Sequence, residues 1–209
     1  QEFDLQNKSF TGPRKVIVNG GTDISKKPIW IEGPHIYKVK GTYYLIAAEG
    51  GTYEGHSQVV FRSNSVWGPY VSYNNNPILT QRNLDSNRSN PVTCAGHADF
   101  IETRNGEWWS VFLGCRPYAS NFYNTGRETF LLPVKWIEGW PVILKENETV
   151  PYAVTKPNLP QQPKASYPLN GNFKVRDEFN DSKLDLQYYF LRTPREKWYE
   201  IKEGALNIT

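Results

Sequence analysis

The sequence predicts an all-β protein that contains four-stranded, blade-like units of a β-propeller, followed by the opening of a second β-domain. The chain carries 14% aromatic residues together with 16 Gly and 15 Pro, a mixture that favours strands joined by many turns. Two of its segments align with each other without a gap, and a Pro-rich stretch separates them from a turn-rich tail. These three observations define the expected fold class and domain order.

Each copy of the repeat begins with a β-hairpin. Residues 32–51 (EGPHIYKVKGTYYLIAAEGG) align with residues 97–116 (HADFIETRNGEWWSVFLGCR) at an offset of 65 residues. In each copy an alternating segment leads to a turn that ends in Gly41 or Gly106, and an aromatic pair opens an apolar return strand. Alternation with a period of two around a glycine-containing turn predicts a hairpin.

Two further strand-like pieces follow each hairpin, at residues 57–63 and 67–73 in the first copy and at residues 128–136 and 140–146 in the second. Four strands per repeat make one propeller blade, and a period of 65 is longer than that of most solenoids. Residues 1–7 and 14–20 resemble the outer half of a preceding blade. We therefore expect about two and a half blades in residues 1–150.

A propeller closes with roughly four to eight blades. We therefore expect the chain to start internally and the remaining N-terminal blades to come from a missing portion or from another chain. Residues 151–170 are expected to form a Pro-rich linker, since repeated proline favours an extended chain. Residues 171–209 are expected to begin a C-terminal β-sandwich domain.

Composition excludes several classes of partner and enzyme. The net charge of +3 comes from 24 basic and 21 acidic side chains with no Lys/Arg run, which argues against nucleic acid, and no apolar stretch is long enough to span a membrane. The motifs of serine hydrolases, phosphate-binding loops and zinc proteases are missing from the sequence. Five N-x-S/T sequons indicate a secreted or periplasmic protein; they begin at Asn7, Asn87, Asn147, Asn180 and Asn207.

The repeat also predicts where polar chemistry lies. Glu32 and His97 occupy equivalent positions at the start of the innermost strand of successive blades, and innermost strands line the central channel of a propeller. The second hairpin turns near residue 105, so we expect Arg116 to return to the end where His97 departs. Its guanidinium offers a fixed fork of donors for vicinal hydroxyls or a carboxylate.

Other interpretations of these residues stay open. A Glu at a strand entrance is often a solvated rim charge, and a single His is more often a hydrogen-bonded core residue than a ligand. The Gly33-Pro34 step after Glu32 favours a fixed carboxylate direction. Hairpin symmetry places Cys94 and Cys115 within reach of a disulfide, with two buried thiols as the alternative. Other candidate carboxylates are Glu49, Glu54 and Glu128.

Five strings carry a resemblance to a known family: EGPHIYK, YYLIAAEGGT, GHADFIET, WWSVFLGCRPY and GRETFLLPVKW. In this order, over residues 30–143, the chain resembles the β-xylosidase and α-L-arabinofuranosidase branch of glycoside hydrolase family 43. The resemblance implies a five-bladed propeller with a C-terminal β-sandwich. It further implies an inverting glycosidase that uses three carboxylates to remove terminal xylose or arabinose from xylan-derived oligosaccharides.

The resemblance assigns roles to three residues. Glu32 corresponds to the general acid, and Arg116 to a residue that binds sugar hydroxyls in the innermost subsite. His97 corresponds to a residue beneath the sugar that holds a calcium ion in many relatives; this ion would be structural or electrostatic, because inversion requires no cofactor for its chemistry. The general-base Asp and the Asp that tunes the acid belong to blades before Gln1, so the segment alone is expected to be inactive.

Two other functions remain as alternatives. A propeller that had lost its catalytic set would bind carbohydrate without hydrolysing it. A protein-interaction propeller is the weaker alternative, because it leaves the expected convergence of Glu32, His97 and Arg116 without a purpose.

Overall fold

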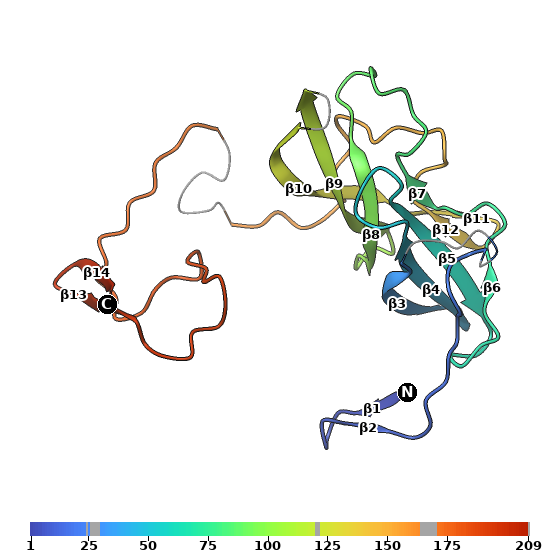
Figure 1. Ribbon diagram of the computed structural model, residues 1–209, viewed down its shortest axis with the longest axis horizontal. Helices are drawn as coiled ribbons and strands as arrows, with labels where there is room; N and C mark the ends of the chain where they lie inside the picture. The colour runs from blue at the N-terminus through green and yellow to red at the C-terminus, as the bar shows by residue number, and fades with distance from the viewer. Residues whose placement is uncertain (24, 26–29, 120–121, 164–170, 209) are drawn as a thin grey trace. The chain divides into compact units, whose positions relative to one another are not determined.

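The computed structural model describes residues 1–23, 25, 30–119, 122–163 and 171–208 (Figure 1). The secondary-structure elements formed by these residues are all β-strands. None of the described residues belongs to a helix that could span a membrane. The all-β prediction is confirmed, whereas the number of blades in the ring stays a prediction. The chain forms two compact units, Gln1–Leu159 and Pro160–Thr209.

The first antiparallel sheet contains the first expected blade. Its strands are β3 (Glu32–Val39), β4 (Thr42–Glu49), β5 (Ser57–Ser63) and β6 (Val71–Ser72) in that order, and β7 (Leu79–Thr80) also pairs with β5. Lys40 and Gly41 in the first turn have φ values of 48° and 88°. Positive φ at both central residues is the conformation that suits a two-residue hairpin between twisted strands.

The second sheet contains three strands instead of four: β8 (Thr93–Glu102), β9 (Trp108–Ala119) and β10 (Phe122–Pro133), with β9 in the centre. The last expected strand pairs elsewhere, because β11 (Lys135–Ile137) and β12 (Trp140–Val142) form a hairpin of their own. Glu138 and Gly139 between them have φ values of 50° and 75°. This tight turn folds β12 back onto β11 instead of onto β10.

The expected outer half of a preceding blade is only partly present. β1 (Glu2–Asp4) pairs with β2 (Ser9–Thr11), but residues 14–20 form no strand, so that part of the prediction is wrong. Two of their apolar side chains pack against a sheet instead of forming a strand. Ile17 and Val18 pack, together with Ile31 and Tyr70, against a buried cluster of Leu45, Ala47, Val59 and Phe61.

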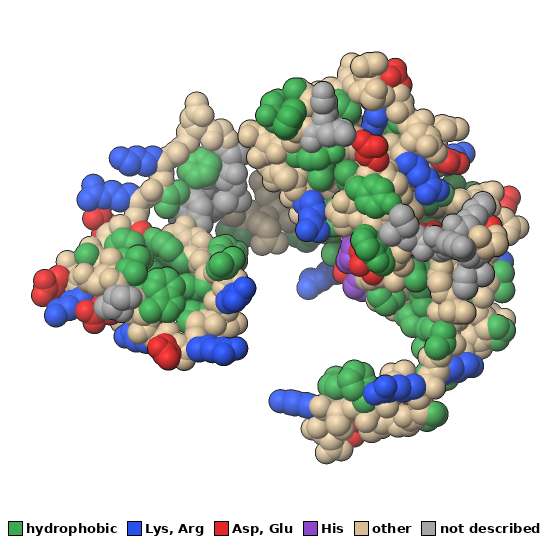
Figure 2. All heavy atoms as spheres, in the orientation of Figure 1, with side chains coloured by type: hydrophobic (Ala, Val, Ile, Leu, Met, Phe, Trp, Pro, Cys, Tyr) green, Lys and Arg blue, Asp and Glu red, His purple; other side chains and the backbone are tan. Residues whose placement is uncertain are grey.

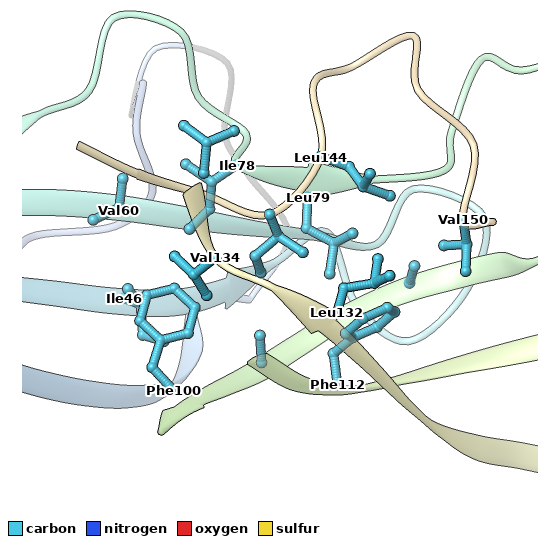
Figure 3. Packing of buried hydrophobic residues seen from close by; sticks show 14 of the residues in the cluster. Ile46, Val60, Ile78, Leu79, Phe100, Phe112, Leu132, Val134, Leu144 and Val150 are labelled. Atoms are coloured by element: carbon cyan, nitrogen blue, oxygen red, sulfur yellow. The ribbon is translucent and has the colours of Figure 1, made fainter. Parts of the chain in front are cut away.

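The main hydrophobic core lies where the two sheets face each other (Figure 3). Alternate residues of β4 serve two cores: Tyr44 and Ile46 join the main one, and Leu45 and Ala47 join the cluster on the other face. Burial on both faces explains why β4 is a continuous apolar run. The labelled members of the main core are Ile46, Val60, Ile78, Leu79, Phe100, Phe112, Leu132, Val134, Leu144 and Val150.

Much of the aromatic content packs the fold. Trp140 stacks on Tyr73 at 4.8 Å between ring centroids, and the Arg62 guanidinium lies 4.1 Å from the Trp140 ring. Trp136 meets Tyr44 at 5.1 Å and Trp108 at 5.4 Å, both edge-on. These rings supply apolar contact area between strands.

The Pro-rich stretch is divided between the two units. The backbone N–H of Asn158 donates to the Glu107 carboxylate (3.1 Å), and the Asn105 amide donates to the Asn158 carbonyl (2.7 Å), which fixes residues 151–159 to the first unit. Residues 164–170 of the expected linker lie outside the described residues. The second unit contains one hairpin, β13 (Tyr199–Lys202) with β14 (Ala205–Ile208).

Candidate active site

β3 is bulged where Glu32 lies. Glu32 pairs with Ala48 and His35 pairs with Ile46, so three steps along β3 oppose two along β4. Gly33 lies in this interval with a φ of 56°, a conformation that glycine adopts without steric cost. A bulge adds one residue, bends the strand and re-aims a side chain, so the direction of Glu32 is set by this interruption of the ladder.

β8 carries two bulges around His97. The ladder to β9 shifts once between Thr93 and Gly96 and again between Gly96 and Asp99. Cys94 and His97 lie inside these intervals with φ values of 56° and 54°. For residues other than glycine this backbone conformation costs about 1–3 kcal/mol and persists only where the surrounding structure holds it. The local sequence therefore does not fix the position of His97 by itself.

The bulge in β3 and the bulges in β8 bring Glu32 and His97 together. A Cβ atom placed on Gly33 would lie 2.5 Å from Cε1 and 2.7 Å from Nε2 of His97, so the imidazole lies directly against the backbone next to Glu32. Both residues are exposed. Figure 2 shows that histidine atoms (purple) and acidic atoms (red) of the first unit reach the surface, without labelling single residues. The contact of the His97 ring with Gly33 brings this imidazole next to the residue that carries the Glu32 carboxylate.

Further along, a polar contact also joins β3 and β8. The Tyr37 hydroxyl donates to the Asp99 carboxylate and accepts from the backbone N–H of Phe100 (2.8 Å). Burial, with the hydrogen bond to Asp99, raises the pKa of Tyr37 well above its usual range, so the hydroxyl stays a donor at neutral pH. Nδ1 of His35 lies 3.7 Å from the same carboxylate. β3 of the first sheet and β8 of the second sheet are therefore neighbours within the first unit.

His56 lies buried beneath this site, and the sequence analysis did not single it out. Its Nδ1 donates to the Cys94 carbonyl (2.8 Å), and its Nε2 is buried without a partner in the described residues. Burial lowers the pKa of His56, and the charges of His97 and Arg127 lower it further, while the bond to Cys94 and the Glu32 carboxylate oppose this. The ring is therefore neutral at pH 7.

On β9, Arg116 lies three residues beyond Leu113, the partner of Gly96 next to His97. Thr93, the first residue of β8, pairs with Cys115, so Arg116 lies beyond the start of β8. The two bulges each add one residue to β8, and this shifts the register away from the one that hairpin symmetry predicts. Its guanidinium is held in a bidentate contact by the Glu128 carboxylate. Arg116 also lines a hollow of about 620 Å³, together with Asn90, Thr129 and Tyr152.

Arg127 is an arginine whose charge acts on His56, which lies beneath the Glu32–His97 site. It lies on β10, where it pairs with Cys115 of β9. Its side chain is exposed, and its charge contributes to lowering the pKa of His56. The sequence signal for it was present in the string GRETFLLPVKW, where it precedes an alternating strand. Hairpin symmetry did not identify it, because it lies on a third strand.

Two of the alternative carboxylates are engaged in structural contacts. Glu49 is 9% exposed and accepts from the N–H (3.2 Å) and hydroxyl (3.4 Å) of Thr22. Hydrogen bonding from Arg116 holds the pKa of Glu128 below its usual value, which makes it a poor proton donor. Glu54 is exposed in the turn before β5. Glu32 is the candidate carboxylate that adjoins His97.

Cys94 and Cys115 are both buried and free, which corresponds to the alternative of two thiols. Burial raises the pKa of Cys115, and the neighbouring Cys94 adds to the shift. Among the described residues there is no group of three or more His, Cys, Asp or Glu side chains that could hold a metal ion.

Comparison with known proteins identifies the family. Residues 1–141 match the model described as Glycosyl hydrolases family 43, and residues 176–209 match that of the Beta xylosidase C-terminal Concanavalin A-like domain. The chain belongs to glycoside hydrolase family 43. The second match falls within residues 171–209, where the opening of a C-terminal β-sandwich was expected.

Two relatives and a solved structure show how far the likeness to other family-43 proteins extends. The non-reducing end alpha-L-arabinofuranosidase of Bacteroides ovatus is 39% identical over 180 residues, 85% of this chain and 32% of that protein. A xylosidase/arabinosidase of Butyrivibrio fibrisolvens is 43% identical over 68% of this chain and 26% of its own length.

The crystal structure of xylan beta-1,4-xylosidase from Bacillus halodurans superposes with a TM-score of 0.78 at 33% identity, over 99% of this chain and 38% of that one. The family-43 chain thus spans about a third of the length of these proteins.

Proposed function

We propose that this family-43 chain forms part of an inverting glycosidase that removes terminal xylose or arabinose from xylan-derived oligosaccharides. The observation that carries the proposal is the contact of the His97 ring with the backbone next to Glu32, at bulges in two neighbouring innermost strands. The names of the arabinofuranosidase of Bacteroides ovatus and the xylosidase of Bacillus halodurans support the substrate class.

In this proposal Glu32 is the general acid. It donates a proton to the glycosidic oxygen as the bond to the sugar breaks. An inverting enzyme also needs a base roughly 6.5–9.5 Å from the acid, with one water molecule on the opposite face of the sugar. We assign the base and the carboxylate that tunes Glu32 to the remaining N-terminal blades.

His97 would lie beneath the sugar, and an arginine would bind its hydroxyls. The resemblance assigns the second role to Arg116, which is already held by Glu128. Arg127 is a second candidate, because its charge acts on the pKa of His56 beneath the site. Replacing each by Ala distinguishes them: the arginine that binds the sugar is the one whose loss raises KM for xylobiose.

A calcium ion near His97 remains a proposal from the resemblance alone. No step of the reaction is assigned to it. Secretion or a periplasmic location is likewise proposed from the sequons alone.

The proposal is tested by the stereochemistry of the products. The full-length protein would be incubated with xylobiose and, separately, with an aryl α-L-arabinofuranoside, and the first anomer released would be identified by proton NMR. Release of α-xylose from xylobiose, or of β-arabinose from the arabinoside, supports inversion. Release of the other anomer contradicts it. Calorimetric binding of xylobiose without turnover would favour a carbohydrate-binding propeller, and neither binding nor turnover would favour a protein-interaction propeller.

A further inference from the structure

Two buried polar side chains, one just before β5 and one within it, reach across to the bulged segment of β8. Nδ1 of His56 donates to the Cys94 carbonyl (2.8 Å), and Oε1 of Gln58 accepts from the backbone N–H of Ala98 (2.7 Å). Both side chains are 0% exposed. One contact precedes His97 along the chain and the other follows it, so the two side chains straddle the residue in its strained conformation.

The bulges explain why these contacts are needed. Between Thr93 and Asp99, only Thr93, Gly96 and Asp99 of β8 pair with residues of β9. The backbone groups of the residues between them therefore leave the regular ladder. A buried N–H or carbonyl without a partner costs about as much as a lost hydrogen bond. His56 immediately precedes β5 and Gln58 lies two residues further on, and both side chains reach residues of β8. They supply the partners that β9 does not.

The surroundings hold the two side chains in place. A Cβ on Gly96 would lie 2.8 Å from Nδ1 and Cε1 of His56, so the ring packs flat where β8 has no side chain. The Thr80 hydroxyl donates to the His56 carbonyl (2.9 Å), and the Ile78 N–H donates to the Gln58 carbonyl (2.8 Å). Both residues are therefore anchored through their backbone as well as through their side chains.

We propose that His56 and Gln58 are positioning residues for the glycosidase site. They hold residues 94–98 of β8 in the bulged form that places the His97 ring against Gly33, and so fix the imidazole relative to Glu32. This inference rests on the proposed function, because that function places His97 beneath the sugar. It adds a specific cause for that placement, which comes from the neighbouring sheet.

A double-mutant cycle in the full-length protein tests the proposal. Gln58→Met keeps the shape of the side chain but removes the acceptor for Ala98, and kcat/KM for xylobiose should fall about 10- to 100-fold, since misplacing a site residue by about 1 Å has effects of this size. In a His97→Ala background the same change should cost less than about twofold, because its effect acts through His97. Equal losses in the two backgrounds would overturn the proposal.

A second pair of variants, at His56, tests the proposal even if the Gln58→Met protein fails to fold. His56→Asn retains a donor near the position of Nδ1 and should stay within about threefold of the parent, whereas His56→Leu removes it and should resemble Gln58→Met. Ser110→Ala is the matched control, since it removes a buried hydrogen bond to the Leu132 carbonyl (3.2 Å) away from His97. If His56→Asn and His56→Leu lose equal activity, or Ser110→Ala loses as much as Gln58→Met, the inference fails.

The outcome is separable from that of the proposed function. Glu32→Gln, measured in parallel, reports on the glycosidase mechanism without involving β5. If Glu32→Gln loses activity on xylobiose while the β5 variants retain it, the positioning role alone is contradicted. If Glu32→Gln retains full activity, the assigned mechanism is contradicted whatever the cycle gives.

Discussion

Gly33→Ala separates the position of His97 from the stability of the fold. Gly33 has a φ of 56°, and a Cβ there would lie 2.5 Å from the far end of the His97 side chain. An L-residue in this backbone region costs roughly 1–2 kcal/mol. The overlap itself costs little stability, because the His97 ring can rotate away, but rotation removes the imidazole from the site. Gly106→Ala is a matched control, since its φ is 78° and it has open space around it.

Both variants should lower the free energy of unfolding by a similar amount, measured by urea denaturation of the full-length protein. Only Gly33→Ala should lower kcat/KM for xylobiose, by up to about 100-fold, because one displaced site residue has effects of this order. Each activity would be measured well below the unfolding midpoint of that variant. Equal activities of the Gly33→Ala and Gly106→Ala proteins would refute the contact between the two innermost strands as the basis of the site.

Two further changes test the contacts around the site. Tyr37→Phe removes the donor to Asp99 and an acceptor for the Phe100 amide, and should cost about 1 kcal/mol of unfolding free energy in urea; an unchanged midpoint would contradict this. Arg116 holds the pKa of Glu128 below its ordinary value of 4.5, so the pair stabilises the fold above that pH and the gain is lost as pH falls through the folded pKa. Arg116→Ala should flatten this acid-side loss in a urea titration; an unaltered slope would exclude the pair as its source.

The hairpins could be predicted from the sequence because their causes are local. Alternation and turn glycines such as Gly41 fix the strands of the first sheet. The aligned repeat singled out Glu32 and His97, but only Glu32 begins its strand, because β8 starts at Thr93 and His97 lies within it. Residues 14–20 were misassigned because apolar side chains such as Val18 are equally satisfied by packing against a sheet face. Pattern alone does not distinguish packing from pairing.

The bulges could not be predicted, since Cys94 and His97 adopt positive φ without being glycine. Their register shift moves Arg116 away from the end of the hairpin where symmetry had placed it. The roles of His56 and Gln58 were equally hidden, because each contacts a residue of the next sheet about 40 positions away. Such contacts are set by how the two sheets pack.

The central claim, that Glu32 is the general acid, is tested most directly by the dependence of Glu32→Gln on the leaving group. Glu54→Gln, at an exposed turn carboxylate, serves as the control. Glu32→Gln should lower kcat for xylobiose about 100- to 10,000-fold, the usual contribution of a general acid, while an aryl xyloside whose leaving group needs no proton is hydrolysed nearly as fast as by the parent. Full activity of the variant on xylobiose, or an equal loss on both substrates, would contradict the assignment.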